Sequence, residues 1–94
     1  RDRPSVVAGD HPIVAGIPSD WPALLGYNRV EVKPGADLVA RVGDDPLIVA
    51  GTFGRGRSAV FTSDCGPHWC PPPFVSWDGY ALMWDNLVRW AAGA

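Results

Sequence analysis

The sequence has little of what would place it in a membrane, on a nucleic acid or among disulfide-rich secreted proteins. Its apolar runs are a few residues long, whereas a membrane-spanning helix needs about 20. The 8 basic residues are scattered and the net charge is −2, so there is no basic surface for a nucleic acid. The 2 cysteines are too few for a disulfide framework, and we expect free thiols.

A signal-peptide pattern is also missing, because residues 1–4 are followed by Ser5 and a short apolar stretch. We therefore expect a cytoplasmic protein with no membrane or nucleic-acid partner. The glycine-rich segment 54–57 is too short for a phosphate loop and lacks the following Lys-Ser/Thr. It predicts a hairpin turn instead, and we expect no bound cofactor.

What is present is typical of a small globular unit with many turns. The hydrophobic fraction is 47%, and the 10 prolines and 11 glycines favour short elements over long helices. Residues 1–94 are therefore predicted to form a single domain or a fragment of one.

The middle of the sequence predicts short strands. Residues 28–33 alternate polar and apolar side chains, as a half-exposed strand does. Residues 37–42 form a second candidate, and the continuous apolar runs at 47–52 and 58–63 predict inner strands. The short connections between these runs favour antiparallel hairpins.

Helical signals lie towards the two ends of the sequence. Asp10, Pro12 and Gly16 predict one short helical turn, and residues 19–25 predict another. Residues 64–77 show no periodicity and predict a long loop, which is more often functional than idle. A terminal helix is predicted over residues 80–92, with Asp78 as its cap.

Four segments in order carry a family resemblance. Residues 51–64 read Gly-Thr-Phe-Gly-Arg-Gly-Arg-Ser-Ala-Val-Phe-Thr-Ser-Asp, and residues 64–69 read Asp-Cys-Gly-Pro-His-Trp. Upstream lie Asp-His-Pro-Ile at 10–13 and Leu-Gly-Tyr-Asn at 25–28. Together they resemble the class I glutamine-amidotransferase-like superfamily, in particular its uncharacterised glutamine amidotransferase and trehalose-utilisation-type branches. The resemblance runs over most of the chain.

This resemblance implies an α/β fold. The chain would be the C-terminal part of a flavodoxin-like sandwich whose central sheet is largely parallel, and it would contribute β-hairpins and a terminal helix. Active members carry a nucleophilic cysteine between glycines on a strand-to-helix turn, and a His-Pro-Glu sequence after a late strand. Neither Cys65 nor Cys70 has that setting, and the segment containing His68 has no glutamate.

We therefore expect a glutamine amidotransferase-like domain without glutaminase activity in this chain. The alternative is the C-terminal half of an active amidotransferase or hydrolase site, completed by upstream sequence or by another chain. A Gly-x-Cys-x-Gly turn in upstream sequence would favour the alternative, so whether the protein is an enzyme stays open at this point.

The candidate site is the polar segment that follows the strand predicted at 58–63. Asp64, Cys65 and His68 are the candidate catalytic residues, and the same three with Trp69 are the candidate ligand-binding residues. We expect His68 to lie within about 4 to 6 Å of Asp64 or Cys65, with Trp69 as one wall of a cleft. The plainer interpretation is a proline-rich connector whose polar residues are packed or solvated.

A zinc site is the other chemistry that this segment suggests. Cys65, His68 and Cys70 offer thiolate and imidazole ligands, with Asp64 or His11 as a fourth. The surrounding prolines restrict the backbone of the loop, but the sequence does not show in which directions the candidate ligands point. We predict no metal site. Of the five tryptophans, only Trp69 and Trp77 lie in the long loop, and the others are expected to serve packing.

Association is expected if the chain belongs to a larger sheet. An open strand edge and an uncovered apolar face both drive pairing with other polypeptides. We therefore predict self-association or a partner chain, together with a small-molecule ligand at residues 64–69.

Overall fold

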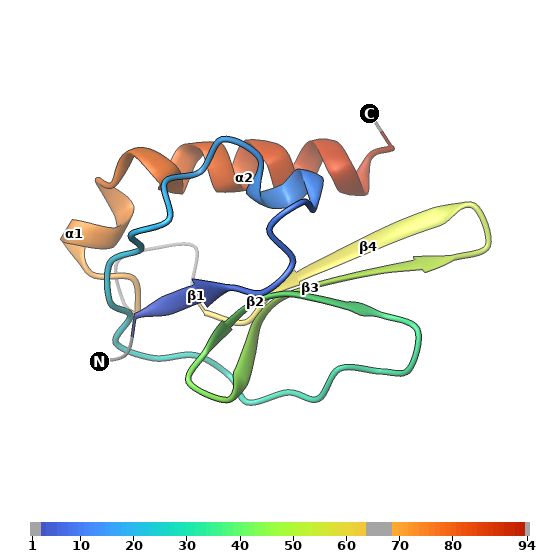
Figure 1. The fold of residues 1–94 in the computed structure, drawn as a ribbon, viewed down its shortest axis with the longest axis horizontal. Coiled ribbons are helices and arrows are strands. Elements are labelled where there is room, and N and C mark those ends of the chain that lie inside the picture. The colour runs from blue at the N-terminus through green and yellow to red at the C-terminus, as the bar shows by residue number, and fades with distance from the viewer. Residues whose placement is uncertain (1–2, 64–68, 94) are drawn as a thin grey trace.

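The computed structural model describes residues 3–63 and 69–93 of the chain. One antiparallel sheet lies against one long helix (Figure 1). The elements in chain order are β1 (Pro4–Val6), the 3-10 helix η1 (Pro12–Val14), β2 (Asp37–Val42), β3 (Asp45–Phe53), β4 (Gly56–Phe61), α1 (Pro72–Val75) and α2 (Asp78–Ala91).

The sheet has the strand order β1-β2-β3-β4, and each neighbouring pair is antiparallel. The predicted hairpins and the predicted terminal helix are therefore confirmed. Two-residue turns join β2 to β3 and β3 to β4, where Gly43 and Gly54 have φ of 59° and 60°. Glycine adopts this left-handed backbone without the steric cost of a Cβ atom.

The core lies between the sheet and α2, with η1 packed beside the helix. Met83 and Leu87 of α2 are buried in this core, as the helical spacing of the apolar residues predicts. Trp21 and Phe74 extend the core towards α1, with ring centroids 6.4 Å apart. Trp77 joins them at 4.9 Å from Trp21, so this loop tryptophan serves packing.

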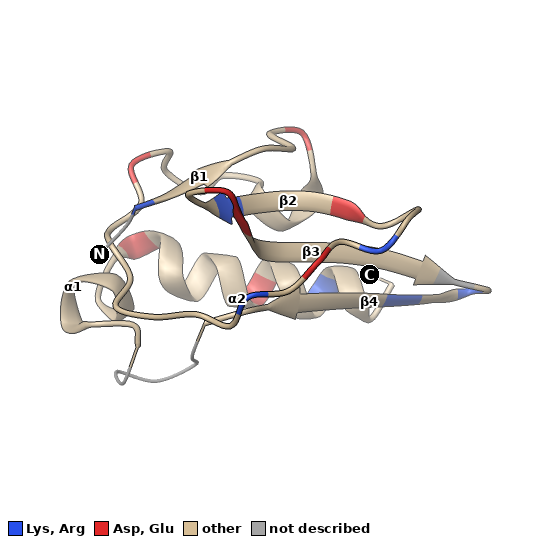
Figure 2. Ribbon diagram, turned by 90° about the horizontal axis from the view of Figure 1, so that it is seen from below, with Lys and Arg blue, Asp and Glu red and all other residues tan. Residues whose placement is uncertain are grey.

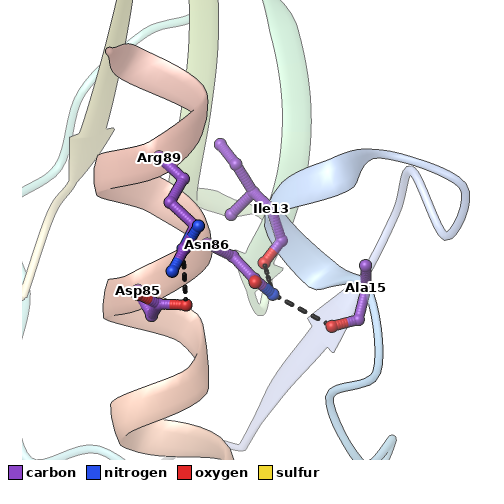
Figure 3. Close-up of polar contacts among 5 residues, drawn as sticks. All are labelled: Ile13, Ala15, Asp85, Asn86 and Arg89. Carbon is purple, nitrogen blue, oxygen red and sulfur yellow. Dashed lines mark hydrogen bonds and ion pairs between the residues drawn. The ribbon is translucent and has the colours of Figure 1, made fainter. Parts of the chain in front are cut away.

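Asn86 ties the two helical elements together (Figure 3). Its side-chain amide donates to the carbonyl oxygens of Ile13 and Ala15, at 3.1 and 2.9 Å. These are carbonyls at the end of η1, where a helix leaves acceptors without intrahelical partners. On the outer side of α2, Arg89 and Asp85 form the expected ion pair at 3.0 Å.

Two strand predictions are wrong. Residues 28–33 form no strand; they cross the face of the sheet opposite α2, below the strands in Figure 1. Asn28 of this segment is tied to the end of β4, where its N–H donates to the Thr62 carbonyl at 2.8 Å. Of the two valines in this segment, Val32 is half-buried and Val30 is 38% exposed. The alternation of polar and apolar residues therefore indicates a segment that lies on a sheet face, not a strand within the sheet.

β4 was predicted to be an inner strand, but within the described chain it is one of the two edge strands of the sheet (Figure 2). Ala59 and Phe61 face the helix, whereas Val60 points to the opposite face and is 49% exposed. A continuous apolar run does not distinguish burial on both faces from partial exposure on one, which is why the prediction failed.

Four further details differ from the sequence-based expectation. Residues 19–25 form no helix, although a short helical turn was predicted there. β1 was not predicted, because three residues give no periodic signal. The end of the predicted loop folds into the short helix α1, which begins after Pro71. The cap of α2 is Trp77, and Asp78 is its first residue. In the part of the chain that the structure describes, no helix has the length and apolar character needed to cross a membrane.

Candidate functional site

The carboxyl end of β4 is anchored by Thr62. This residue is 3% exposed, and its hydroxyl donates to the Pro46 carbonyl at 3.0 Å. Its N–H donates to the Leu47 carbonyl at 2.9 Å, which continues the contact with β3 beyond the last residue of β4. The chain that follows therefore starts from a fixed position.

Ser63 links this end of β4 to two other segments. Its hydroxyl donates to the Gly26 carbonyl at 2.6 Å and lies 3.7 Å from the Cys70 sulfur. Cys70 is fully buried. Burial keeps this thiol away from substrates in solution, so Cys70 is a packing residue at the base of the site.

Trp69 packs against Gly26 beside this region, and its role as one wall of a cleft stays a prediction. The indole lies so close to Gly26 that a Cβ atom at position 26 would be 2.7 Å from Trp69 Nε1. The Trp69 carbonyl accepts a hydrogen bond from Leu25 N at 2.8 Å, which fixes the backbone as well as the ring. Because the side chain is only half-buried, part of the indole faces solvent.

Tyr27, the residue after Gly26, contacts a charged side chain. The Tyr27 hydroxyl donates to Asp45 Oδ2 at 2.9 Å, and Arg29 Nε lies 3.6 Å from the same oxygen. The Arg29 side chain is 84% exposed and the Asp45 side chain 29% exposed, so the guanidinium is largely solvated. The carboxylate therefore gains most of its fixed position from the tyrosine.

Of the predicted site residues, the structure places Trp69 only. Asp64, Cys65 and His68 lie outside the described residues, so their mutual distances stay a prediction. Within residues 3–63 and 69–93, no group of three His, Cys, Asp or Glu side chains could hold a metal ion. The former zinc candidate His11 uses Nδ1 to accept from Ile13 N at 3.2 Å, which caps η1.

Sequence reasoning missed Ser63, Gly26, Tyr27 and Asp45 as members of this region. Residues 25–28 had been noted only as part of a resemblance. Gly26 and Ser63 contact each other although they are 37 positions apart in the sequence. A glycine followed by a tyrosine does not by itself indicate that an indole will pack where the glycine has no side chain.

An open groove lies on the sheet face opposite α2, where residues 28–33 cross. This open groove of about 260 Å³ is lined mainly by small and apolar side chains, namely Val30, Ala36, Val49, Gly51, Ser58 and Val60, with Glu31 and Lys33. The groove has no buried polar group that would orient a ligand, in contrast to the end of β4.

The chain is similar to a protein family and to solved structures. A family model described as "Putative glutamine amidotransferase" matches residues 2–93. No curated protein matches the chain. Two solved structures from Salmonella typhimurium are similar: "Cytoplasmic Protein STM3548", with 39% identity and a TM-score of 0.90, and "Cytoplasmic Protein STM1381", with 38% and 0.89.

Both matches include 96% of this chain but only 36% of the Salmonella chain. The chain thus spans little more than a third of the length of these relatives.

Proposed function

The chain belongs to the glutamine amidotransferase-like family, and we propose that it serves as a scaffold that presents a small-molecule site at the carboxyl end of β4, without glutaminase activity of its own. The observation that carries this proposal is the fixed position of Trp69 against Gly26, directly beside the anchored end of β4. A rigid, partly exposed aromatic ring next to polar residues is a common feature of ligand pockets.

The chemistry at this position is consistent with binding. Ser63 and the buried Thr62 hold the strand end, and the next residues in the sequence are the polar candidates Asp64, Cys65 and His68. We propose that these candidates contact the ligand from one side and the Trp69 indole from the other. The proposed location is the cytoplasm, which is supported by the names of the two Salmonella relatives.

The absence of glutaminase activity is proposed from the cysteines. Cys65 is preceded by Asp64 and followed by Gly66-Pro67, which is not the Gly-x-Cys-x-Gly turn of a nucleophile. Cys70 is fully buried, and a thiol attacks only when the substrate can reach it. His68 has no glutamate two residues later, so the orienting carboxylate of an active site is missing too.

The test is a screen of small amides, carboxylates and sugars, followed through the tryptophan indole N–H signals in NMR spectra. The proposal expects ligands that shift the Trp69 signal and leave unchanged the signal of Trp84, whose indole N–H is buried in a partly buried side chain. Assignments come from single Trp→Phe variants. If no fragment moves the Trp69 signal at millimolar concentration, or if all the signals move together, the binding site proposed here is wrong.

The length of the matched Salmonella proteins favours a second candidate function. Because the chain spans 36% of the matched Salmonella proteins, their larger remaining part has room for a nucleophile. In that case residues 64–69 supply one side of an active site that another segment completes. Glutamine hydrolysis by a chain that includes such a segment, but not by residues 1–94 alone, would favour this candidate.

A further inference from the structure

His11 closes the first turn of η1 with its side chain. Pro12 has no N–H, so the Ile13 N–H is the first donor that η1 presents. This N–H donates to His11 Nδ1 at 3.2 Å, while the Val14 N–H donates to the His11 carbonyl at 3.0 Å. Because Ile13 is fully buried, its N–H depends on one imidazole nitrogen for a partner.

This hydrogen bond requires a neutral imidazole. Nδ1 accepts only when it carries no proton, and both ring nitrogens are donors in the imidazolium ion. Histidine is the side chain whose ordinary change of charge falls between about pH 5 and pH 8. Protonation of His11 therefore removes the acceptor of the Ile13 N–H and sets one donor against another.

A second cation lies close to His11. The imidazole packs against the Trp90 ring of α2 with centroids 5.1 Å apart, and the Arg57 guanidinium of β4 lies 5.2 Å from the centre of the same ring. An aromatic ring attracts a cation, but this ring already has one. A protonated His11 would add a like charge beside Arg57, and like charges repel.

The other charged groups nearby do not pair with His11. Asp10 precedes it in the sequence and is exposed. Asp85 and Arg89 of α2 pair with each other on the outer side of the helix, and Asn86, which contacts η1, is uncharged. Among the described residues the ion pairs join arginines to aspartates, and none includes His11. An imidazolium at this position therefore gains no ion pair in exchange for the lost hydrogen bond.

The turn that His11 closes also fixes the contact between η1 and α2 (Figure 3). Asn86 donates to the Ile13 and Ala15 carbonyls at 3.1 and 2.9 Å, and the Ile13 side chain is buried in the core. We define residues 11–15 as the η1 segment. We propose that protonation of His11 makes the η1 segment open away from α2 more often, so that it is held closed at neutral pH and loosened in mild acid.

Amide hydrogen exchange of residues 1–94 tests this proposal at about pH 8 and about pH 5. The rates are corrected for the intrinsic pH dependence of exchange and expressed as protection factors. The Ile13 amide should lose protection by about three- to tenfold at the lower pH, the effect of losing one hydrogen bond. The amide of Leu87, which lies well inside α2, should keep its protection.

His11→Asn is the matched variant, because asparagine also caps the start of a helix but takes up no proton. Its Ile13 amide should be protected equally at both pH values. An equal loss of protection in the variant and in the unmodified chain would overturn the proposal, since another group would then be responsible. Protection of Ile13 that does not change with pH in the unmodified chain would overturn it too.

A measurement on the unmodified chain alone keeps the proposal falsifiable if His11→Asn does not fold. The NMR shift of the His11 Cε1 proton reports protonation, and it should change over the same pH range as the Ile13 protection. Protection lost over a different range, or an imidazole that stays neutral until the whole chain unfolds, contradicts the proposal. Ligand binding at Trp69 is not involved, so failure of one proposal is distinguishable from failure of the other.

Discussion

Trp69 occupies the space where a side chain at position 26 would lie, with Nε1 at 2.7 Å from an ideal Cβ on Gly26. The contact joins two segments that are far apart in the sequence and lies at the candidate site. Because the Trp69 carbonyl is bound to Leu25 N, the ring cannot move away without disturbing the backbone.

Gly26→Ala is therefore expected to destabilise the fold by about 1 to 3 kcal/mol, the usual cost of forcing an atom into a packed site. The measurement is the free energy of unfolding in urea. Gly9→Ala is the matched control, because a Cβ at Gly9 has no neighbour within 4 Å. An equal effect of the two substitutions would show that Trp69 is free to rearrange.

Thr62→Val should cost about 1 to 3 kcal/mol, because it removes a buried hydroxyl and leaves the Pro46 carbonyl without that donor. Thr52→Val, at an exposed position of β3, should change stability far less. Chemical denaturation of both variants gives the comparison. A neutral Thr62→Val variant would mean that the hydroxyl does not anchor the end of β4.

Asn86→Ala should destabilise the protein by about 1 to 3 kcal/mol, because the two hydrogen bonds that hold the end of η1 are each worth about 0.5 to 1.5 kcal/mol. Asp85→Asn, one residue away, breaks a solvent-exposed ion pair and should cost about 0.5 kcal/mol or less. Similar losses in the two variants would contradict the role given to Asn86. Amide hydrogen exchange of residues 13–17 provides a local readout, and it should rise in Asn86→Ala alone.

The sequence predicted the hairpins and the terminal helix well, because their signals are local. Gly43 and Gly54 mark turns that need a left-handed backbone, and Met83 and Leu87 repeat at helical spacing. The position of β4 in the sheet could not be predicted in this way. Strand order depends on contacts between distant segments, and an apolar run such as Ala59-Val60-Phe61 suits an inner strand and an outer one equally well.

The candidate site was predictable only in outline. Trp69 was predicted to be one wall of a cleft because it lies in a long loop beyond a strand. The structure places it against Gly26 near the end of β4, and the cleft itself stays a prediction. Its partner Gly26 and the anchor Ser63 could not be recognised, because nothing in either local sequence specifies a contact across 37 positions. Asp64, Cys65 and His68 lie outside the described residues and stay predictions.

The central claim is that this chain has no glutaminase activity of its own, and ammonia release from L-glutamine tests it most directly. Purified residues 1–94 are assayed beside the Cys65→Ala and Cys70→Ala variants, with an established glutaminase as the positive control. We expect all three proteins to release no more ammonia than buffer does. Ammonia release by the unmodified chain that is lost in Cys65→Ala and kept in Cys70→Ala would contradict the claim, because Cys65 would then be a working nucleophile.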